Sequence, residues 1–206
     1  MVDFQLYLIT DRQQTAGRAL PAVVADALAG GVKAVQLREK DLPAGRLLEL
    51  ARELRSITRE HGARLLVNDR LDVALAAEAD GVHLGINSMP VSDVRKLAGN
   101  RMLIGYSAHS VAEALQAERD GADFVTFGPV FHTPSKAEYG APLGLELLAE
   151  AAESLTIPIF ALGGVKKSSI PAVMATDCHG VAMISAIIAA DSPLMEAHEL
   201  LNLLTE

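Results

Sequence analysis

The sequence predicts a closed (β/α)8 barrel, the TIM-barrel architecture, as one domain over residues 1–206. Short apolar segments bounded by polar turns occur eight times along the chain, and amphipathic segments rich in Ala, Leu, Glu and Arg lie between them. No Pro/Ser-rich linker divides the chain. The first apolar segment also lacks the Gly-x-Gly-x-x-Gly turn of a doubly wound nucleotide-binding sheet, which favours the closed barrel.

The eight apolar segments are the predicted strands. They cover residues 4–10, 34–39, 64–69, 81–85, 102–107, 124–130, 157–164 and 180–187. Strands that alternate with helices in this way are typical of a parallel sheet covered by helices.

The segments between the strands show helical periodicity. The clearest is "AGRLLELARELRSITREHG", in which Leu47, Leu50, Leu54 and Ile57 share one face and charged residues occupy the other. A second helix is predicted in "HSVAEALQAERDGADF", where a Ser at 110 followed by a Glu at 113 forms a capping-box pattern.

Composition excludes several classes of protein. The formal net charge of −8 argues against a nucleic-acid or anionic-membrane partner. The single cysteine, Cys178, excludes an intrachain disulfide framework and fits a cytoplasmic location. The N-terminus lacks the basic region of a signal peptide, and no apolar stretch approaches the roughly 18 residues of a membrane span. Aromatic residues make up only 4% of the chain, so we expect a core of Ala, Leu, Val and Ile.

Polar residues at the carboxyl ends of the strands are the candidate functional residues, because that face carries the chemistry in such barrels. The second strand ends in Gln36, Arg38 and Lys40, which alternate along the chain. Their burial would be unfavourable without an anionic partner, so they predict an anion site. The alternative interpretation is that Arg38 forms an ion pair with Glu39 that helps to close the barrel.

The third and fifth strands end in two further candidate groups. Asn68 and Asp69 either cap the following helix or, facing a group of cations, contribute to a Mg²⁺–diphosphate site. Ser107 and His109 follow the fifth strand, and a histidine at a barrel mouth is a candidate acid–base group. A His within the fourth strand, His83, is predicted to be a satisfied interior histidine.

The last three strands lead into loops suited to phosphate. The loop after the sixth strand, "HTPSK", places Thr133, Ser135 and Lys136 together, and a lysine binds diphosphate as a point charge. The seventh strand ends in Gly163-Gly164, where backbone N–H groups can approach a ligand closely, and Ser185 follows the eighth. These two loops often bind phosphate in barrels.

Several motifs together resemble the thiamine phosphate synthase family, which includes the similar thiazole tautomerases. The resemblance runs from about residue 4 to about residue 200. It rests on "YLITDR", "GGVKAVQLREKD", "LLVNDRLDVALAAEADGVHLG", "IGYSAHS", "GADFVTFGPVFHTPSK", "IPIFALGGV" and "GVAMISAI". It implies a barrel enzyme that couples hydroxymethylpyrimidine diphosphate with thiazole phosphate, through a pyrimidine-methyl cation, to give thiamin phosphate and pyrophosphate.

The resemblance also implies a role for each candidate residue. Asp69 would bind Mg²⁺, Ser107 would lie near the leaving pyrophosphate, and Lys136 would stabilise the charge on it. The pyrimidine diphosphate would be bound by Gln36, Arg38, Lys40, Asn68 and Lys136. The thiazole phosphate would be bound by Thr133, Ser135, Gly164, Ile184 and Ser185.

The sequence departs from the family pattern after the fourth strand. Synthases usually have Gly-Gln-x-Asp there, with the Asp as a second Mg²⁺ ligand, whereas this chain has Ile86 and Ser88 at those positions. A neutral serine is a poorer ligand for Mg²⁺ than a carboxylate. A milder change is Ser135 in place of the usual Thr.

Two alternatives to the synthase therefore stay open at this stage. One is a metal-independent thiazole phosphate carboxylate tautomerase that uses His109. The other is a catalytically inactive barrel that binds thiazole or thiamin phosphates. Lys40, Asp69 and Lys136 favour the synthase, because an isomerase has less need of a diphosphate and metal set. A homo-oligomer is compatible with the sequence.

Overall fold

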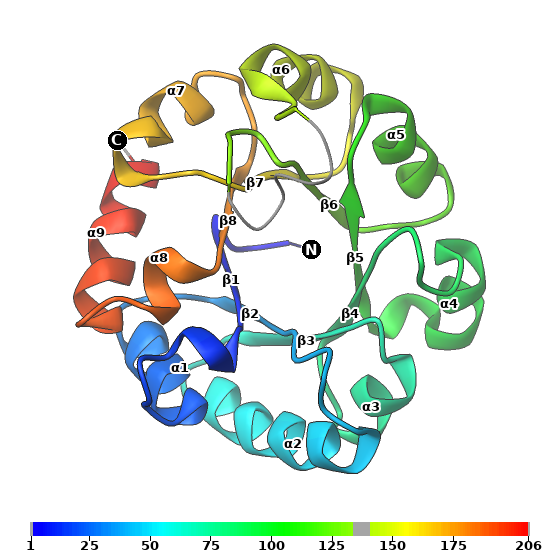
Figure 1. Cartoon of the computed structure of the whole chain (residues 1–206). Helices are drawn as coiled ribbons and strands as arrows, with labels where there is room; N and C mark the ends of the chain where they lie inside the picture. The colour runs from blue at the N-terminus through cyan, green and yellow to red at the C-terminus, as the bar shows by residue number, and fades with distance from the viewer. Residues whose placement is uncertain (1, 134–140, 206) are drawn as a thin grey trace.

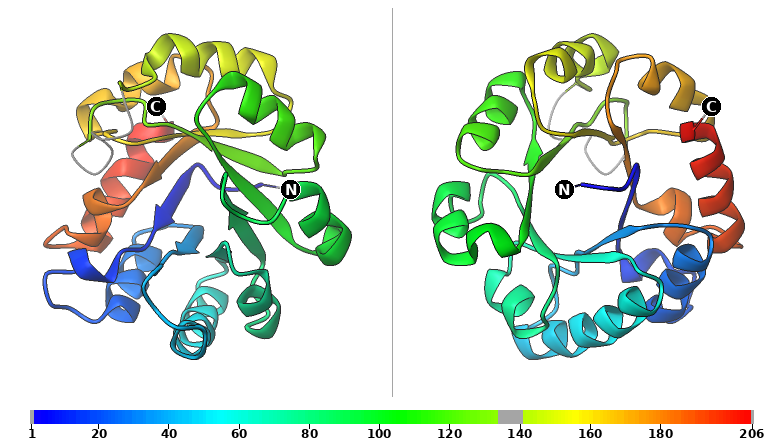
Figure 2. Two further views of the ribbon diagram at one scale, coloured as in Figure 1. Left: turned by 45° about the vertical axis from the view of Figure 1, so that its right-hand side comes forward. Right: turned by 180° about the vertical axis from the view of Figure 1, so that it is seen from behind.

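The computed structural model describes residues 2–133 and 141–205 and forms one closed barrel. The eight strands pair in chain order, β1 to β8, and β8 closes the barrel by pairing with β1. Every neighbouring pair is parallel. Figure 1 shows the helices as a ring around the strands, and the two views in Figure 2 show the same arrangement. The predicted (β/α)8 fold is confirmed. The assignment of all 206 residues to one domain stays a prediction.

The strands are short and almost entirely buried. They are β1 (Leu6–Ile9), β2 (Ala34–Leu37), β3 (Arg64–Asn68), β4 (Gly81–Leu84), β5 (Leu103–Ala108), β6 (Phe124–Phe127), β7 (Ile159–Leu162) and β8 (Gly180–Met183). Most predicted strands extended too far at their carboxyl ends. Arg38 and Lys40 lie beyond β2, and the residues from Ser185 onward form a helix. A strand ends where its backbone hydrogen bonds to the neighbouring strands end. The apolar content of the sequence does not show that position.

The helices vary more in length than the strands. They are α1 (Leu20–Ala29), α2 (Ala44–Glu60), α3 (Leu71–Ala76), α4 (Val91–Ala98), α5 (Val111–Arg119), α6 (Gly144–Ser154), α7 (Ile170–Met174), α8 (Ser185–Ile188) and α9 (Pro193–Thr205). Within the described residues, 3-10 turns accompany them at Arg12–Gln14, Gly99–Arg101 and Lys167–Ser169. No helix among the described residues is long and apolar enough to cross a membrane.

The core has two layers of different composition. Between strands and helices it is aliphatic, as expected. Inside the barrel it is built around Phe4, Tyr7, Phe124 and Phe160, so the prediction of a core without aromatic residues is wrong for this layer. Phe4 stacks on Phe160 with 5.2 Å between ring centroids and meets Phe124 edge to face at 5.7 Å. A few large side chains fill the narrow interior of such a barrel, so a low aromatic content suffices.

At the amino-terminal end of the barrel, which we call the floor, two acids repeat one arrangement. Asp80 precedes β4, accepts a hydrogen bond from the Leu65 backbone N–H (2.8 Å) and is paired with Arg55 of α2 (2.7 Å). Asp123 precedes β6, accepts from the Ile104 N–H (2.7 Å) and is paired with Arg95 of α4 (2.6 Å). Each acid therefore ties a strand, the preceding strand and a helix together, and each is neutralised.

Candidate active site at the mouth of the barrel

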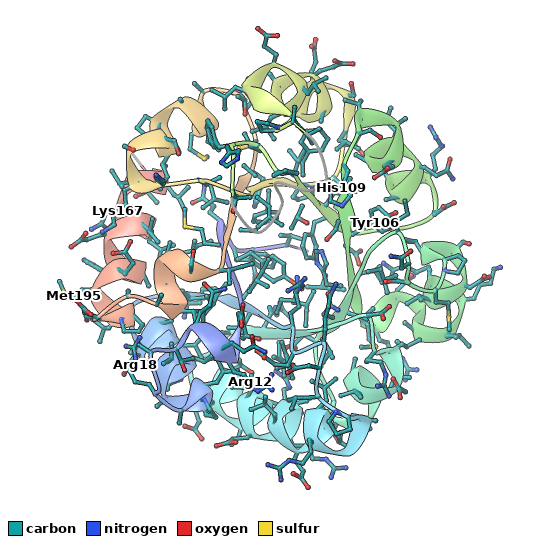
Figure 3. The ribbon with its side chains drawn as sticks, in the orientation of Figure 1. Arg12, Arg18, Tyr106, His109, Lys167 and Met195 are labelled. Carbon is teal, nitrogen blue, oxygen red and sulfur yellow. The ribbon has the colours of Figure 1, made fainter. Side chains whose placement is uncertain are left out.

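Arg38 does not pair with Glu39, so the alternative interpretation of the second strand is wrong. The buried Glu39 carboxylate faces β1, where it accepts hydrogen bonds from the Thr10 hydroxyl (2.8 Å) and from the Arg12 backbone and guanidinium (3.1 and 3.2 Å). Figure 3 shows Arg12 near α1, and its guanidinium also binds Asp41 (2.6 and 2.7 Å). The half-buried Arg38 side chain has no hydrogen-bond or ion-pair partner among the described residues.

Asn68 and Asp69 do not cap the helix that follows them. The residue before α3 is Arg70, and no side chain caps this helix. Asp72 lies in its first turn, paired with Arg70 (2.8 Å). Asp69 has a φ of 64°, an unfavourable conformation for a residue other than glycine, at a cost of about 1 kcal/mol or more. Its exposed carboxylate makes no hydrogen bond within the described part of the chain. A strained, unpaired carboxylate at the mouth fits a ligand-binding role better than a cap.

A continuous chain of buried polar groups crosses the barrel interior toward the mouth. The Gln36 amide Nε2 donates to the Tyr7 hydroxyl (3.2 Å), which contacts His83 Nδ1 (3.3 Å). His83 Nε2 contacts the Ser107 Oγ (3.0 Å), to which the Thr126 hydroxyl also donates (3.3 Å). His83 is therefore the satisfied interior histidine that the sequence predicts. The sequence patterns did not identify Tyr7 and Thr126 as members of this chain of polar groups. The only signal in the sequence is that each places a hydroxyl inside an apolar strand.

Burial sets the protonation state of this interior chain. Desolvation, with a smaller contribution from the Arg38 charge, lowers the pKa of His83 from 6.5 to about 3. Desolvation raises the pKa of the Tyr7 hydroxyl above its ordinary value, against the hydrogen bond from Gln36. Both groups are therefore neutral at physiological pH.

His83 is also the neighbour that several candidate residues share. It pairs in register with Asn68 of β3, and its carbonyl accepts the Asp69 N–H (2.8 Å). Its side chain contacts Ser107 (3.0 Å) and feels the charge of Arg38. The fold thus gathers the predicted residues of the second, third and fifth strands around one buried imidazole.

His109 lies at the end of β5, on the opposite side of the barrel axis from Arg12 (Figure 3). Its Nδ1 lies 2.6 Å from the Gly128 carbonyl oxygen, which can only accept, so Nδ1 carries the proton and Nε2 is the basic nitrogen. The predicted cap of α5 is confirmed, because Ser110 Oγ accepts the Glu113 N–H (3.1 Å). The Glu113 carboxylate accepts the His109 N–H (2.8 Å) and so holds this residue in place.

The loops after β6 and β7 pack directly on one another. Gly163 and Gly164 have positive φ values of 92° and 69°. A Cβ on Gly164 would lie 2.7 Å from the His132 carbonyl oxygen, so packing alone requires glycine there. This contact places the β7 loop against His132, which precedes the half-buried Thr133 in the chain. Ser135 and Lys136 lie outside the described residues.

The end of β8 completes the predicted phosphate side of the mouth. Ile184 precedes α8 and packs against the interior cluster of Phe4, Tyr7 and Phe160. Ser185 is the exposed first residue of α8. No hydrogen bond joins Ser185 to the groups around His83 in the parts of the chain described here.

The loop after β4 lacks a metal ligand of the usual kind. Ser88 Oγ accepts the Gly85 N–H (2.9 Å) and closes its own turn, while the Ile86 side chain is 68% exposed. Over residues 2–133 and 141–205, no group of three or more His, Cys, Asp or Glu residues could hold a metal ion. Asp69 is thus the single candidate carboxylate among the predicted site residues.

Comparison with known protein families shows which family this chain belongs to. A family model described as thiamine monophosphate synthase matches residues 6–187. The chain belongs to this family.

Individual relatives agree. The chain is 59% identical to "Putative thiamine-phosphate synthase" of Geobacter sulfurreducens, over 98% of this chain and 95% of that protein. It is 46% identical to the thiamine-phosphate synthase of Chloroflexus aurantiacus, over 97% and 92%. The solved structure of thiamine phosphate pyrophosphorylase from Pyrococcus furiosus superposes with a TM-score of 0.90 at 38% identity, over 98% of this chain and 96% of that chain. These names favour a transferase over the tautomerase and over an inactive binding protein.

Proposed function

We propose that this family member is a thiamine-phosphate synthase. It couples hydroxymethylpyrimidine diphosphate with thiazole phosphate and releases pyrophosphate. Beyond family membership, the observation that carries the proposal is the half-buried Arg38, which has no anionic partner among the described residues. A guanidinium in this position stabilises a bound diphosphate because it can form paired hydrogen bonds to phosphate oxygens.

Two groups of residues divide the mouth between the substrates. The pyrimidine diphosphate is bound by Gln36, Arg38, Lys40, Asn68 and Lys136. The thiazole phosphate is bound by Thr133, Ser135, Gly164, Ile184 and Ser185. The single cysteine and the net charge of −8 further support a cytoplasmic enzyme that acts on small molecules.

The residues present fit a Mg²⁺ ion that arrives with its substrate. Mg²⁺ usually keeps several waters and takes one or two carboxylates together with substrate phosphate oxygens. The exposed Asp69 carboxylate, without a protein partner among the described residues, is such a ligand. Ser88 already accepts the Gly85 N–H and could contribute only a neutral oxygen. When bound, the metal would neutralise part of the negative charge on the diphosphate.

In the proposed reaction the methylene C–O bond breaks first, and both electrons leave with the diphosphate. Arg38 and Lys136 stabilise the negative charge on the leaving group, and Ser107 donates a hydrogen bond to it. The thiazole nitrogen then gives its lone pair to the pyrimidine-methyl cation and forms the new C–N bond. The apolar interior, with Ile184 against Phe160, limits the access of water to the cation. His109, with Nε2 free to accept a proton, is a candidate acid–base group.

The test is a coupled assay with purified protein, both substrates and Mg²⁺, in which thiamin phosphate and pyrophosphate are followed together. We expect equal amounts of the two products and loss of turnover with EDTA. A parallel reaction with the thiazole phosphate carboxylate tautomer reports isomerisation. Isomerisation without coupling, lost in His109→Ala, would contradict the proposal. Tight binding of thiamin phosphate without any turnover would also contradict it.

A further inference from the structure

The Ser107 hydroxyl at the barrel mouth has two hydrogen-bond contacts with the protein. The Thr126 hydroxyl donates to its oxygen at 3.3 Å, and the His83 Nε2 lies 3.0 Å from the same atom. Among the described residues, the only side chains in contact with the Ser107 hydroxyl are His83 and Thr126, and with Thr126 as donor His83 Nε2 is the one possible acceptor of the Ser107 proton. What Ser107 offers to a ligand therefore depends on which His83 nitrogen carries a proton.

The Gln36 amide determines which group donates each hydrogen bond along the buried chain Gln36–Tyr7–His83–Ser107. The Gln36 amide has only protons to offer at Nε2, so the Tyr7 oxygen is an acceptor in that contact. The Tyr7 proton then needs another acceptor, and the Tyr7 side chain is fully buried. His83 Nδ1, at 3.3 Å, is the acceptor that the described residues provide.

This arrangement assigns the tautomer of His83. Nδ1 accepts from Tyr7, and a neutral imidazole must then carry its proton on Nε2 and donate it to Ser107. The opposite tautomer would make Tyr7 accept from both Gln36 and His83. The buried Tyr7 proton would then have no acceptor, which is unfavourable. A doubly protonated imidazole meets the same objection, and no carboxylate contacts the ring within the described residues.

We propose that Tyr7 and His83 are positioning residues: Tyr7 fixes the His83 tautomer, and His83, together with Thr126, occupies the acceptor sites of Ser107 and so directs its proton toward an anionic oxygen of the ligand at the mouth. The identity of that oxygen, on the leaving diphosphate, rests on the proposed function. The direction of hydrogen-bond donation, from Gln36 through Tyr7 and His83 to Ser107, is independent of the proposed function. Tyr7 and His83 touch no substrate atom in this scheme, and Ser107 keeps its proton while it donates.

The first experiment reads the tautomer without any turnover. In protein labelled with ¹⁵N-histidine, at a pH well above the ordinary histidine pKa, ¹H–¹⁵N correlations distinguish the two tautomers. We expect an Nε2–H signal that disappears in His83→Gln, and an Nδ1–H signal from His109 as an internal contrast. An Nδ1–H tautomer for His83 would overturn the proposal.

The second experiment is a double-mutant cycle between Tyr7→Phe and Ser107→Ala. Tyr7→Phe keeps the buried ring but frees His83 to change tautomer. We expect kcat to fall about tenfold with KM nearly unchanged, and no further fall in the Ser107→Ala background. The amide of His83→Gln can donate from the position of the imidazole Nε2, so this variant should keep most of the parent kcat. His83→Leu has no donor there and should lose it. Equal effects of Tyr7→Phe in both backgrounds would overturn the proposal.

Thr58→Val is the matched control, because it also removes a buried hydroxyl, from α2, which contributes none of the predicted site residues. Its kcat should equal that of the parent protein. If the parent protein does not couple the substrates, the proposed function fails, while the tautomer measurement still decides the proposal about Tyr7 and His83.

Discussion

The floor and the mouth of this barrel treat charge in opposite ways. At the floor, Asp80 and Asp123 are each paired with an arginine and each accept a backbone N–H. At the mouth, Arg38 and Asp69 have no side-chain partner among the described residues, and Asp69 adopts a strained backbone conformation. Folding alone would not favour the second arrangement, because unpaired, partly buried charges are unfavourable. The contrast teaches that the floor charges are neutralised within the fold, whereas the mouth charges have no such partner among the described residues.

The largest effect should come from breaking the mouth at Arg38. Arg38→Met removes the unpaired guanidinium, so we expect kcat/KM for coupling to fall about 10³-fold, or ~4 kcal/mol of transition-state stabilisation. The melting temperature should stay the same or rise. Steady-state kinetics and thermal unfolding together check this. A fall in stability that accounts for the lost activity would contradict the assignment of Arg38 to a ligand.

Removal of a floor ion pair should have the opposite result, because stability should fall while activity is kept. Asp80→Asn leaves the largely buried Arg55 without its counter-ion, so we expect a loss of about 3 kcal/mol in the free energy of unfolding. Well below the melting temperature, kcat should be unchanged. Denaturant unfolding and the coupling assay measure the two quantities. The exposed pair Arg59–Glu78 is the control, since Glu78→Gln should leave the free energy of unfolding nearly unchanged.

A substitution that adds a carboxylate in the loop after β4 should strengthen Mg²⁺ binding at the mouth. Ser88→Asp can still accept the Gly85 N–H and adds a second carboxylate to the mouth. We expect the Mg²⁺ concentration for half-maximal activity to fall by about tenfold, or ~1.4 kcal/mol. Ser88→Ala should leave the Mg²⁺ requirement unchanged. An unaltered requirement in Ser88→Asp would place residue 88 outside the reach of the metal.

The smallest effect concerns the pH dependence of stability through His83. Its pKa falls from 6.5 in the unfolded chain to about 3 in the folded protein, chiefly because of burial. Between these values only the unfolded state binds the proton. Stability is therefore lost as pH falls below 6.5, with a slope of at most about 1.4 kcal/mol per pH unit. Chemical denaturation across this range should show a flatter dependence in His83→Gln. Parallel curves for the two proteins would contradict the buried, neutral histidine.

Much of this molecule could be predicted from local pattern. Each strand and helix carries its own periodicity, so eight alternations predict the barrel, and the topology of a barrel brings every strand's carboxyl end to one mouth. That is why Gln36, Asn68 and Ser107, far apart in the chain, could be predicted to lie in one region of the barrel. Strand ends were less predictable, because ladder pairing depends on the neighbouring strand.

Tertiary structure alone decided the partners. Glu39 turns to Arg12 rather than to its neighbour Arg38, because the two sides of an extended chain face different surroundings. Tyr7 lies 76 residues from His83, and His83 lies 24 from Ser107, so no local pattern links them. The few aromatic residues gather inside the barrel for the same reason, since the closed sheet creates that interior. The sequence by itself determined the elements and the residue types at their ends, while contacts between distant strands decided which charges are paired and which have no partner among the described residues.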